Sequence, residues 1–439
     1  MAKVKNIQTL TIEEKLEQAF VPKSEQPYTI PKNWVWTKLG RLVDIKTGKE
    51  DANFATEQGK YFFFTCAEDP LLCDTSVFYG ESVLIAGNGA FHVNYYDGEF
   101  NAYQRTYVIQ NFKAVNGKFV YYHTLRDIQN ITSGNRGSTI RYIRLGDLTG
   151  SLFPLPPIPE QHRIVARIES LFEKLDHARE LVQSALDSFE SRKAAILHKA
   201  FAGELTAKWR EKNGVKLESW EYKQLEEVCI SIYDGDHMAP PKREFGIPFL
   251  VISNINKGYV TFEETRFVPE DYYNSLSETR TPQEGDLLYS IVGSFGIPAI
   301  VKENIKFCFQ RHIALLRPDT KYLNYKCFWY IMQTQEVFNQ VDSIATGTAQ
   351  RTVPIRGLRK ISFSFPSLLE QQEIVRTLDS LLEKEQHAKD KLEPILDHIA
   401  LIKKSILARA FRGELGTNDP SEESAMELLK NLQTKKKRR

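Results

Sequence analysis

One segment of this sequence occurs twice. When the sequence is shifted by 210 residues, positions 153–206 align with 363–416 without a gap, and 22 of the 54 aligned residues are identical. Identical pairs include Glu160-Gln161 with Glu370-Gln371, His177-Ala178 with His387-Ala388, and Gly203-Glu204-Leu205 with Gly413-Glu414-Leu415. Weaker matches precede each copy, such as Trp34 with Trp220. A tandem repeat of this extent predicts two similar structural units.

The repeated segment is predicted to form a long helix. In the first copy the apolar residues are spaced alternately four and three apart: Ile164, Ile168, Leu171, Leu175, Ala178, Val182, Ala185 and Phe189. This spacing is typical of a coiled-coil seam. The second copy continues the stripe, with Glu385 as its one interruption, through Ile374, Leu378, Leu381, Ala388, Leu392, Ile395, Ile399, Ile402 and Ile406. Because each seam needs a partner, we expect the two helices to pair antiparallel within the chain. A helix packed on its own domain, or a homodimeric coiled coil, would show the same stripe.

The region before each helix is rich in aromatic residues, glycine and short β-type runs, which is typical of a mixed α+β domain. The runs expected to form strands are Lys60–Cys66, Ser82–Ala86, Thr106–Gln110, Pro248–Ser253, Asp286–Ile291 and His312–Leu316. Helices are expected near Phe119–Asp127 and Tyr325–Gln340. The predicted fold class is therefore α+β, with two globular domains separated by two long antiparallel coiled-coil helices in an internal pseudo-twofold repeat.

The repeat also sets the domain boundaries that we expect. They are an N-terminal helical segment (1–29), a first globular domain (30–152), a central long helix (153–206), a linker (207–216), a second globular domain (217–362), a distal long helix (363–416) and a basic C-terminal tail (417–439).

Composition excludes several classes of protein. The formal net charge is +2, which is too balanced to indicate or exclude a nucleic-acid partner by itself. The apolar runs are far shorter than the ~20 residues that cross a bilayer, and the first residues lack the apolar segment of a secretion signal. The five cysteines contain no CxxC pair, so we expect free thiols rather than a zinc site or disulfides. The histidines of the long helices lack the spacing of metal ligands.

The two copies carry motifs of a known family. Each begins with a proline-containing run that ends in Glu-Gln, Leu155-Pro156-Pro157-Ile158-Pro159-Glu160-Gln161 and Phe365-Pro366-Ser367-Leu368-Leu369-Glu370-Gln371. Each ends in Ala-Phe-x-Gly-Glu-Leu, at 200–205 and 410–415, and the first domain opens with Tyr28-Thr29-Ile30-Pro31-Lys32-Asn33-Trp34. Over nearly its whole length the chain resembles the specificity subunits of type I restriction–modification enzymes.

The resemblance implies a function and a set of partners. Each globular domain would be a target recognition domain that reads a few base pairs of a bipartite, asymmetric site in double-stranded DNA. The long helices would space these domains and dock two modification subunits, which methylate adenine with S-adenosylmethionine. Restriction subunits that use ATP and Mg²⁺ would complete the nuclease. The chain itself would be a non-catalytic subunit without a cofactor, in the cytoplasm of a bacterium or archaeon, with no membrane partner.

Catalytic motifs are absent from the sequence, in agreement with this expectation. No Asn/Asp-Pro-Pro-Tyr/Phe run of an amino-methyltransferase occurs, and no GxxxxGK[ST] phosphate loop is present. The alternative from another class is a tandem coiled-coil scaffold that joins proteins and does not bind DNA. A salt-dependent mobility shift on mixed duplex DNA would separate the two hypotheses.

Candidate DNA contacts lie in loops at matching places of the two domains, where Arg, Lys, Asn, Gln, Ser and Thr are the types that reach bases and phosphates. They are Lys49, Gln104, Arg105, Asn135, Arg136, Ser138, Thr139, Arg141, His237, Lys242, Arg243, Gln310, Arg311, Thr346, Thr348, Gln350 and Arg351. The Gln-Arg pairs occur in both halves, whereas residues that read different half-sites should differ. A fold-stabilising role therefore stays open for Gln104-Arg105 and Gln310-Arg311.

Overall fold

The protein is described by a computed structural model that covers residues 20–133, 141–235, 240–348 and 350–435. The chain divides into two compact units, which we call unit 1 (Met1–Val182 with Pro394–Arg439) and unit 2 (Gln183–Glu393). Most of the expected N-terminal helical segment lies outside the described residues. Its described part holds one 3-10 turn, η1 (Lys23–Glu25).

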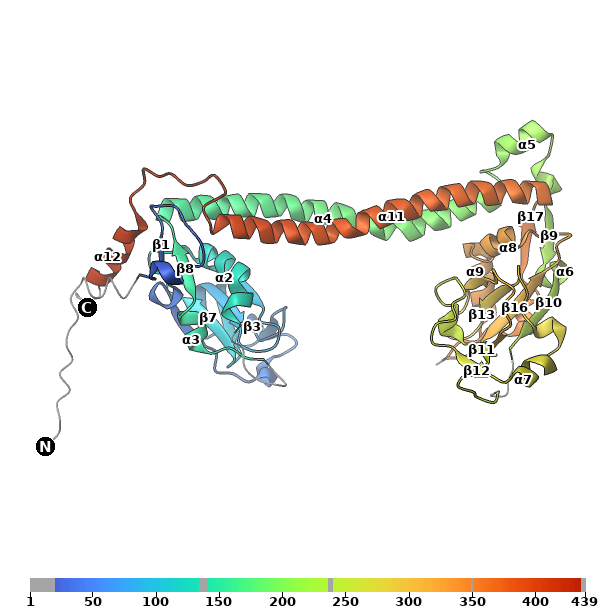
Figure 1. Cartoon of the computed structure of the whole chain (residues 1–439), viewed down its shortest axis with the longest axis horizontal. Coiled ribbons are helices and arrows are strands. Elements are labelled where there is room, and N and C mark those ends of the chain that lie inside the picture. Colours follow the sequence, from blue (N-terminus) through green and yellow to red (C-terminus); the bar gives the residue numbers. More distant parts are fainter. Residues whose placement is uncertain (1–19, 134–140, 236–239, 349, 436–439) are drawn as a thin grey trace. The chain divides into compact units, whose positions relative to one another are not determined.

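Unit 1 is built around a six-stranded sheet with the order β2-β7-β5-β6-β3-β4. These strands are β2 (Asp44–Thr47), β3 (Tyr61–Phe64), β4 (Leu71–Cys73), β5 (Phe78–Ala86), β6 (Val93–Ala102) and β7 (Thr106–Gln110). The helix α2 (Gly117–Ile131) lies beside the sheet (Figure 1), and Phe119 and Val120 of α2 pack against Val83, Ile85 and Ile109. The short helix α3 (Leu145–Thr149) follows. The strands expected at 60–66, 82–86 and 106–110 are confirmed.

Unit 2 has two smaller sheets. The four-stranded sheet has the order β10-β16-β13-β14 and the three-stranded sheet has the order β12-β11-β15. These strands are β10 (Cys229–Asp234), β11 (Ile247–Leu250), β12 (Arg266–Val268), β13 (Leu287–Ser290), β14 (Pro298–Ile300), β15 (Cys308–Phe309) and β16 (Ile313–Pro318). The shorter helices are α6 (Leu225–Val228), α7 (Glu270–Ser275), α8 (Tyr325–Ile331), α9 (Gln335–Ile344) and α10 (Ile355–Leu358).

The single helix expected at 325–340 is wrong, because two helices occupy this region. The hydroxyl of Thr334 accepts a hydrogen bond from the backbone N–H of Val337. This N-cap starts α9 and ends the continuity with α8.

A two-stranded ribbon leads into each long helix. In unit 1, β1 (Val35–Lys38) pairs with β8 (Leu152–Leu155), and in unit 2, β9 (Glu221–Gln224) pairs with β17 (Ser362–Phe365). The helices α4 (Ile158–Phe201) and α11 (Leu368–Ala410) begin only after these strands. The boundaries expected at 153 and 363 therefore fall inside strands, because the aromatic residues there belong to the cores of the globular parts.

Within each unit, α4 and α11 run antiparallel (Figure 1). In unit 1, Glu160 contacts Thr417 and Asp176 contacts Lys403, so the residue numbers rise on one segment as they fall on the other. In unit 2, Arg192 contacts Glu385 and Thr206 contacts Glu370, in the same antiparallel sense. The seam departs from the predicted stripe at Ile402, which is 47% exposed. Lys403 faces α4 instead. A straight α-helix has 3.6 residues per turn, so a stripe that repeats every seven residues drifts slowly around the helix.

Two segments pack more tightly than their sequences indicate. Residues 417–439 are expected to be a basic tail, yet they contain α12 (Ala425–Lys435), whose Ala425 and Leu429 are buried in the core of unit 1. The expected linker 207–216 contains α5 (Ala207–Asn213), whose Arg210 is buried in unit 2. Both segments lack a long periodic stripe, so composition alone misses their packing.

Candidate nucleic-acid interface

In unit 1 the turn after β2 is held against the turn before β7. The backbone N–H of Gly48 donates to the carbonyl of Thr106 at 3.2 Å. A Cβ atom at Gly48 would lie 1.8 Å from the carbonyl oxygen of Ala102, so only glycine fits this approach. The contact places Lys49 beside the Gln104-Arg105 turn.

A third loop joins these two and adds Arg141. Gly87, which follows β5, donates to the carbonyl of Arg105 at 2.8 Å. Gly89 donates to the carbonyl of Arg141 at 3.0 Å, and Ile143 donates back to the carbonyl of Gly87 at 3.0 Å. We call these four segments (48–49, 87–89, 104–105 and 141–143) loop cluster 1.

Unit 2 repeats this arrangement contact by contact. Gly235 donates to the carbonyl of Ile313 at 3.2 Å, where Gly48 meets Thr106 in unit 1. Ile291 donates to the carbonyl of His312 at 3.0 Å, and Gly293 donates to that of Arg351 at 2.9 Å. These segments (235, 291–293, 310–312 and 351–353) form loop cluster 2. Most of the described candidate residues therefore gather at one place in each unit.

Loop cluster 1 presents unpaired cations. Lys49, Arg105 and Arg141 are exposed, and none of them has an ion pair within the described part of the chain. Gln104 is also exposed but is engaged in the fold, since its amide contacts the carboxylate of Asp51 and its N–H donates to the carbonyl of Glu50 at 2.9 Å. Of this pair, Arg105 is the residue whose side chain is exposed and has no ion pair among the described residues.

Loop cluster 2 contains one arginine that the fold restrains. Arg351 donates to the Asp342 carboxylate at 2.6 Å and to the Asp342 carbonyl at 2.7 Å, and its guanidinium lies 5.2 Å from the centre of the Phe295 ring. Arg311, in contrast, is exposed. Burial and the charge of Arg311 lower the pKa of His312, so this imidazole is neutral at pH 7. Gln310 is half-buried and its N–H donates to the Leu250 carbonyl at 2.9 Å.

The other candidates are more scattered. Lys242 and Arg243 are exposed on the loop that pairs with the outer edge of β12, where the N–H of Arg243 donates to the carbonyl of Phe267 at 3.0 Å. Thr346, Thr348 and Gln350 are exposed on the turn before Arg351. Five candidates lie outside the described residues: Asn135, Arg136, Ser138, Thr139 and His237.

The repeated Glu-Gln pair holds the start of each long helix against its globular part. Gln161 accepts from the N–H of Asn116 at 2.7 Å and donates to the carbonyl of Pro156 at 3.0 Å. Gln371 repeats these bonds with Asn324 at 2.8 Å and Pro366 at 2.8 Å. Both glutamines are buried. They tie the start of each long helix to the N-cap of α2 or α8, which explains why the pair occurs in both copies.

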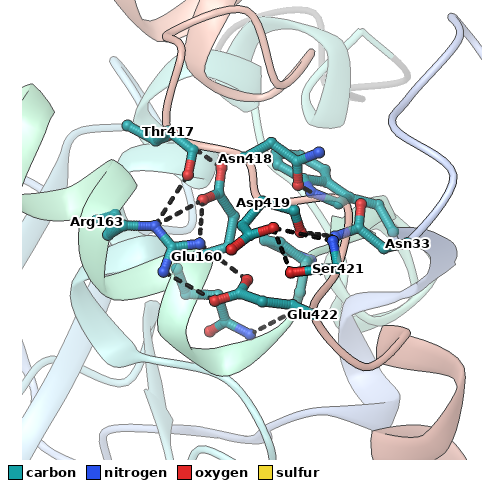
Figure 2. Close-up of polar contacts among 11 residues, drawn as sticks. Asn33, Glu160, Arg163, Thr417, Asn418, Asp419, Ser421 and Glu422 are labelled. Atoms are coloured by element: carbon teal, nitrogen blue, oxygen red, sulfur yellow. Dashed lines mark hydrogen bonds and ion pairs between the residues drawn. The ribbon is translucent and has the colours of Figure 1, made fainter.

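The glutamates of the same pair bind the chain where the other copy ends. Glu160 accepts from the hydroxyl of Thr417 at 2.7 Å and from Arg163, which also forms two 2.8 Å bonds to Glu422 (Figure 2). Asn33 donates to the carbonyl of Asp419 at 3.0 Å. Burial raises the pKa of Glu160, and the bonds from Thr417 and Arg163 oppose this shift. In unit 2, Glu370 accepts from Thr206 at 2.7 Å in the same way.

Comparison with known proteins identifies the family. The type I restriction modification DNA specificity domain matches residues 31–183 and 218–395. Together these ranges cover most of the chain, and each contains one loop cluster. The chain belongs to this family. It is a type I specificity subunit with two DNA recognition domains.

Relatives share this organisation along most of their length. The EcoDI specificity subunit of Escherichia coli is 29% identical over 88% of this chain and 89% of its own. The MjaVIII specificity subunit of Methanocaldococcus jannaschii is 22% identical over 83% and 90%. The solved HsdS subunit of Thermoanaerobacter tengcongensis is 21% identical, with a TM-score of 0.55 over 89% of this chain and all of that one, so it shares the fold.

Other kinds of site are not found in the described parts of this specificity subunit. No three His, Cys, Asp or Glu side chains in residues 20–133, 141–235, 240–348 and 350–435 are grouped so that they could hold a metal ion. Over the same residues, no helix is both long enough and apolar enough to span a membrane.

Proposed function

We propose that this subunit reads a bipartite, asymmetric site in double-stranded DNA, with loop cluster 1 at one half-site and loop cluster 2 at the other. The observation that carries the proposal is the repetition of the same backbone contacts in both units around different exposed side chains. Unit 1 presents Lys49, Arg105 and Arg141, whereas unit 2 presents Arg311 and, outside loop cluster 2, Lys242 and Arg243. The same backbone arrangement with different exposed side chains suits two domains that recognise different DNA sequences.

We propose that α4 and α11 pair along their whole lengths as an antiparallel coiled coil that relates the two units by a pseudo-twofold axis. The antiparallel contacts inside each unit support this pairing. A helix rises 1.5 Å per residue, so a pair of about 40 residues would be a rigid spacer of ~60 Å. The exposed sides of this spacer would dock two modification subunits, and restriction subunits would join them.

Chemistry is assigned to the partners in this proposal. The modification subunits would bind S-adenosylmethionine and methylate adenine, and the restriction subunits would use ATP and Mg²⁺. This chain would supply sequence recognition and assembly in the cytoplasm, without a cofactor of its own.

Exchange of one recognition domain tests the division of the site. If residues 30–152 are replaced by the matching domain of a related subunit, we expect one half-site to change and the other to stay. Methylation mapping of DNA from cells that carry the altered system measures this. If both half-sites changed together, the two units would not be independent readers. If no duplex bound at all, a protein scaffold would be favoured.

Lengthening the helices tests the spacer. The insertions belong inside the helices, after Val182 and after Glu393, because Thr206 and Thr417 at the helix ends hold Glu370 and Glu160. Four residues in each helix would add about 6 Å and turn one unit by about 40°. A base pair adds about 3.4 Å and roughly 34°. We expect the gap between unchanged half-sites to grow by one or two base pairs. An unchanged gap with full activity would refute the spacer role.

A further inference from the structure

A groove lies beside Lys49, over the neighbouring strands β2, β7 and β5. It is a pocket of about 600 Å³ lined by Lys46, Thr47, Lys49, residues 77–81 and residues 110–112. Its lining therefore shares Lys49 with loop cluster 1. Lys46 was not among the candidate residues of the sequence, because it stands in a strand and not in a loop with a repeated motif.

The alternation of β2 places Lys46 on the face of the sheet away from α2. Ile45 packs with the cluster that contains α2, and neighbouring residues of a strand point to opposite faces. Lys46 pairs with Val108, which is buried with Leu84 in a separate cluster on that other face. The groove therefore opens on the face that α2 does not cover.

The groove is positively charged because its carboxylates are neutralised or turned away. Asp44 is bound by Lys113 and by Asn111 at 3.1 Å, and the hydrogen bond from Lys113 lowers the pKa of Asp44. Glu81 accepts from the hydroxyl of Tyr95 at 2.9 Å, and its carboxylate lies next to Gly117 of α2. The charges left for a ligand are those of Lys46 and Lys49, which are both exposed.

The remaining lining offers few free amides. The amide of Gln110 is engaged, since it donates to the carbonyl of Tyr79 and to the hydroxyl of Ser82, both at 2.9 Å. The ring of Tyr79 belongs to the other face, because Phe78 and Leu84 of β5 are the residues that pack on the face of Lys46. The ammonium groups of Lys46 and Lys49 remain, and they suit phosphates rather than bases.

We propose that this groove binds the sugar–phosphate backbone of one DNA strand next to the bases that loop cluster 1 reads. The inference rests on the proposed function. Lys46 stands three residues before Lys49, so at most about 10 Å of chain separates them, which is the rise of about three base pairs. Lys46 would therefore contact a phosphate beside the bases that loop cluster 1 reads, and it would contribute affinity without sequence preference.

The test measures binding of the full-length chain to two duplexes, one of random sequence and one with the methylation-mapped site, over a range of KCl concentrations. Lys46→Ala is expected to weaken binding to both duplexes about eight-fold at 0.1 M salt and to reduce the slope of log K against log[salt] by about 0.9. Lys46→Arg should retain the slope. The matched control is Lys38→Ala, an exposed strand lysine of unit 1 outside the groove, which should change neither quantity.

The proposal is overturned if Lys46→Ala leaves the slope unchanged, or if it alters the methylated sequence. If the unaltered chain binds neither duplex, the proposed DNA-binding function is contradicted, and the proposal for the groove, which rests on it, is contradicted as well.

Discussion

Replacing Arg210 with Met is expected to destabilise unit 2 by about 3–5 kcal/mol, because it leaves a buried carboxylate without its counter-charge. Arg210 donates to Glu370 at 2.6 Å, and their side chains are 9% and 0% exposed. Arg210 also donates to Thr206 at 2.9 Å and to the carbonyl of Gly203 at 2.5 Å. The measurement is a urea titration followed by hydrogen exchange of peptides from α8 and β13.

Two further variants separate the buried charge from lost packing. Adding Glu370→Gln to Arg210→Met removes the unpaired charge and keeps an acceptor oxygen for the indole of Trp220, while the amide NH2 can donate to the hydroxyl of Thr206, so most of the stability should return. Arg192→Met breaks a pair with Glu385 whose side chains are 40% and 30% exposed, and solvent screening should keep its cost below about 1 kcal/mol. Equal effects of the two single variants would contradict the explanation.

The elements that the sequence predicts well are those whose stability comes from local pattern. The strand at Thr106–Gln110 has its expected bounds, and the heptad stripes correspond to α4 and α11. The pattern fails where a distant contact decides the structure. Ile402 fits the stripe but is exposed, while Lys403 faces α4 and binds Asp176. The local sequence near Lys403 does not indicate that Asp176 is its partner.

The candidate interface shows the same limit. Hydroxyl, amide and basic residues in loops selected these segments from the sequence, and the backbone bonds of Gly48, Gly87 and Gly89 bring them together in one cluster. Residue type could not distinguish Arg105, which is exposed, from Arg351, which Asp342 holds. That distinction depends on which acidic side chain the fold places near each arginine, and the amino-acid sequence does not give this.

Replacing His123 with Leu is expected to make unit 1 more stable and less sensitive to acid. His123 is 1% exposed, neither ring nitrogen has a hydrogen-bond partner in the described parts of the chain, and its ring packs against Phe153 and Phe411. Unit 2 has the apolar Ile331 at the matching place in α8, and Ile331 is buried. Removing buried polar atoms that lack partners should stabilise unit 1 by about 1–2 kcal/mol at pH 7.5.

The pH dependence follows from the pKa of His123, which burial lowers to about 3. In the unfolded chain the imidazole takes up a proton near pH 6.5, whereas in the folded chain it stays neutral until about pH 3. Between these values the unfolded state binds more protons than the folded state. The contribution of His123 to stability is therefore fully present above pH 6.5, and the free energy of unfolding falls by about 1.4 kcal/mol per pH unit as the pH drops. Urea titrations at pH 7.5 and pH 4.5, read by hydrogen exchange of α2 peptides, should show this loss in the unaltered chain and not in His123→Leu. His177→Gln, at an exposed position of α4, should behave as the unaltered chain at both pH values. An equal loss of stability between pH 7.5 and pH 4.5 in His123→Leu would show that another group causes the pH dependence.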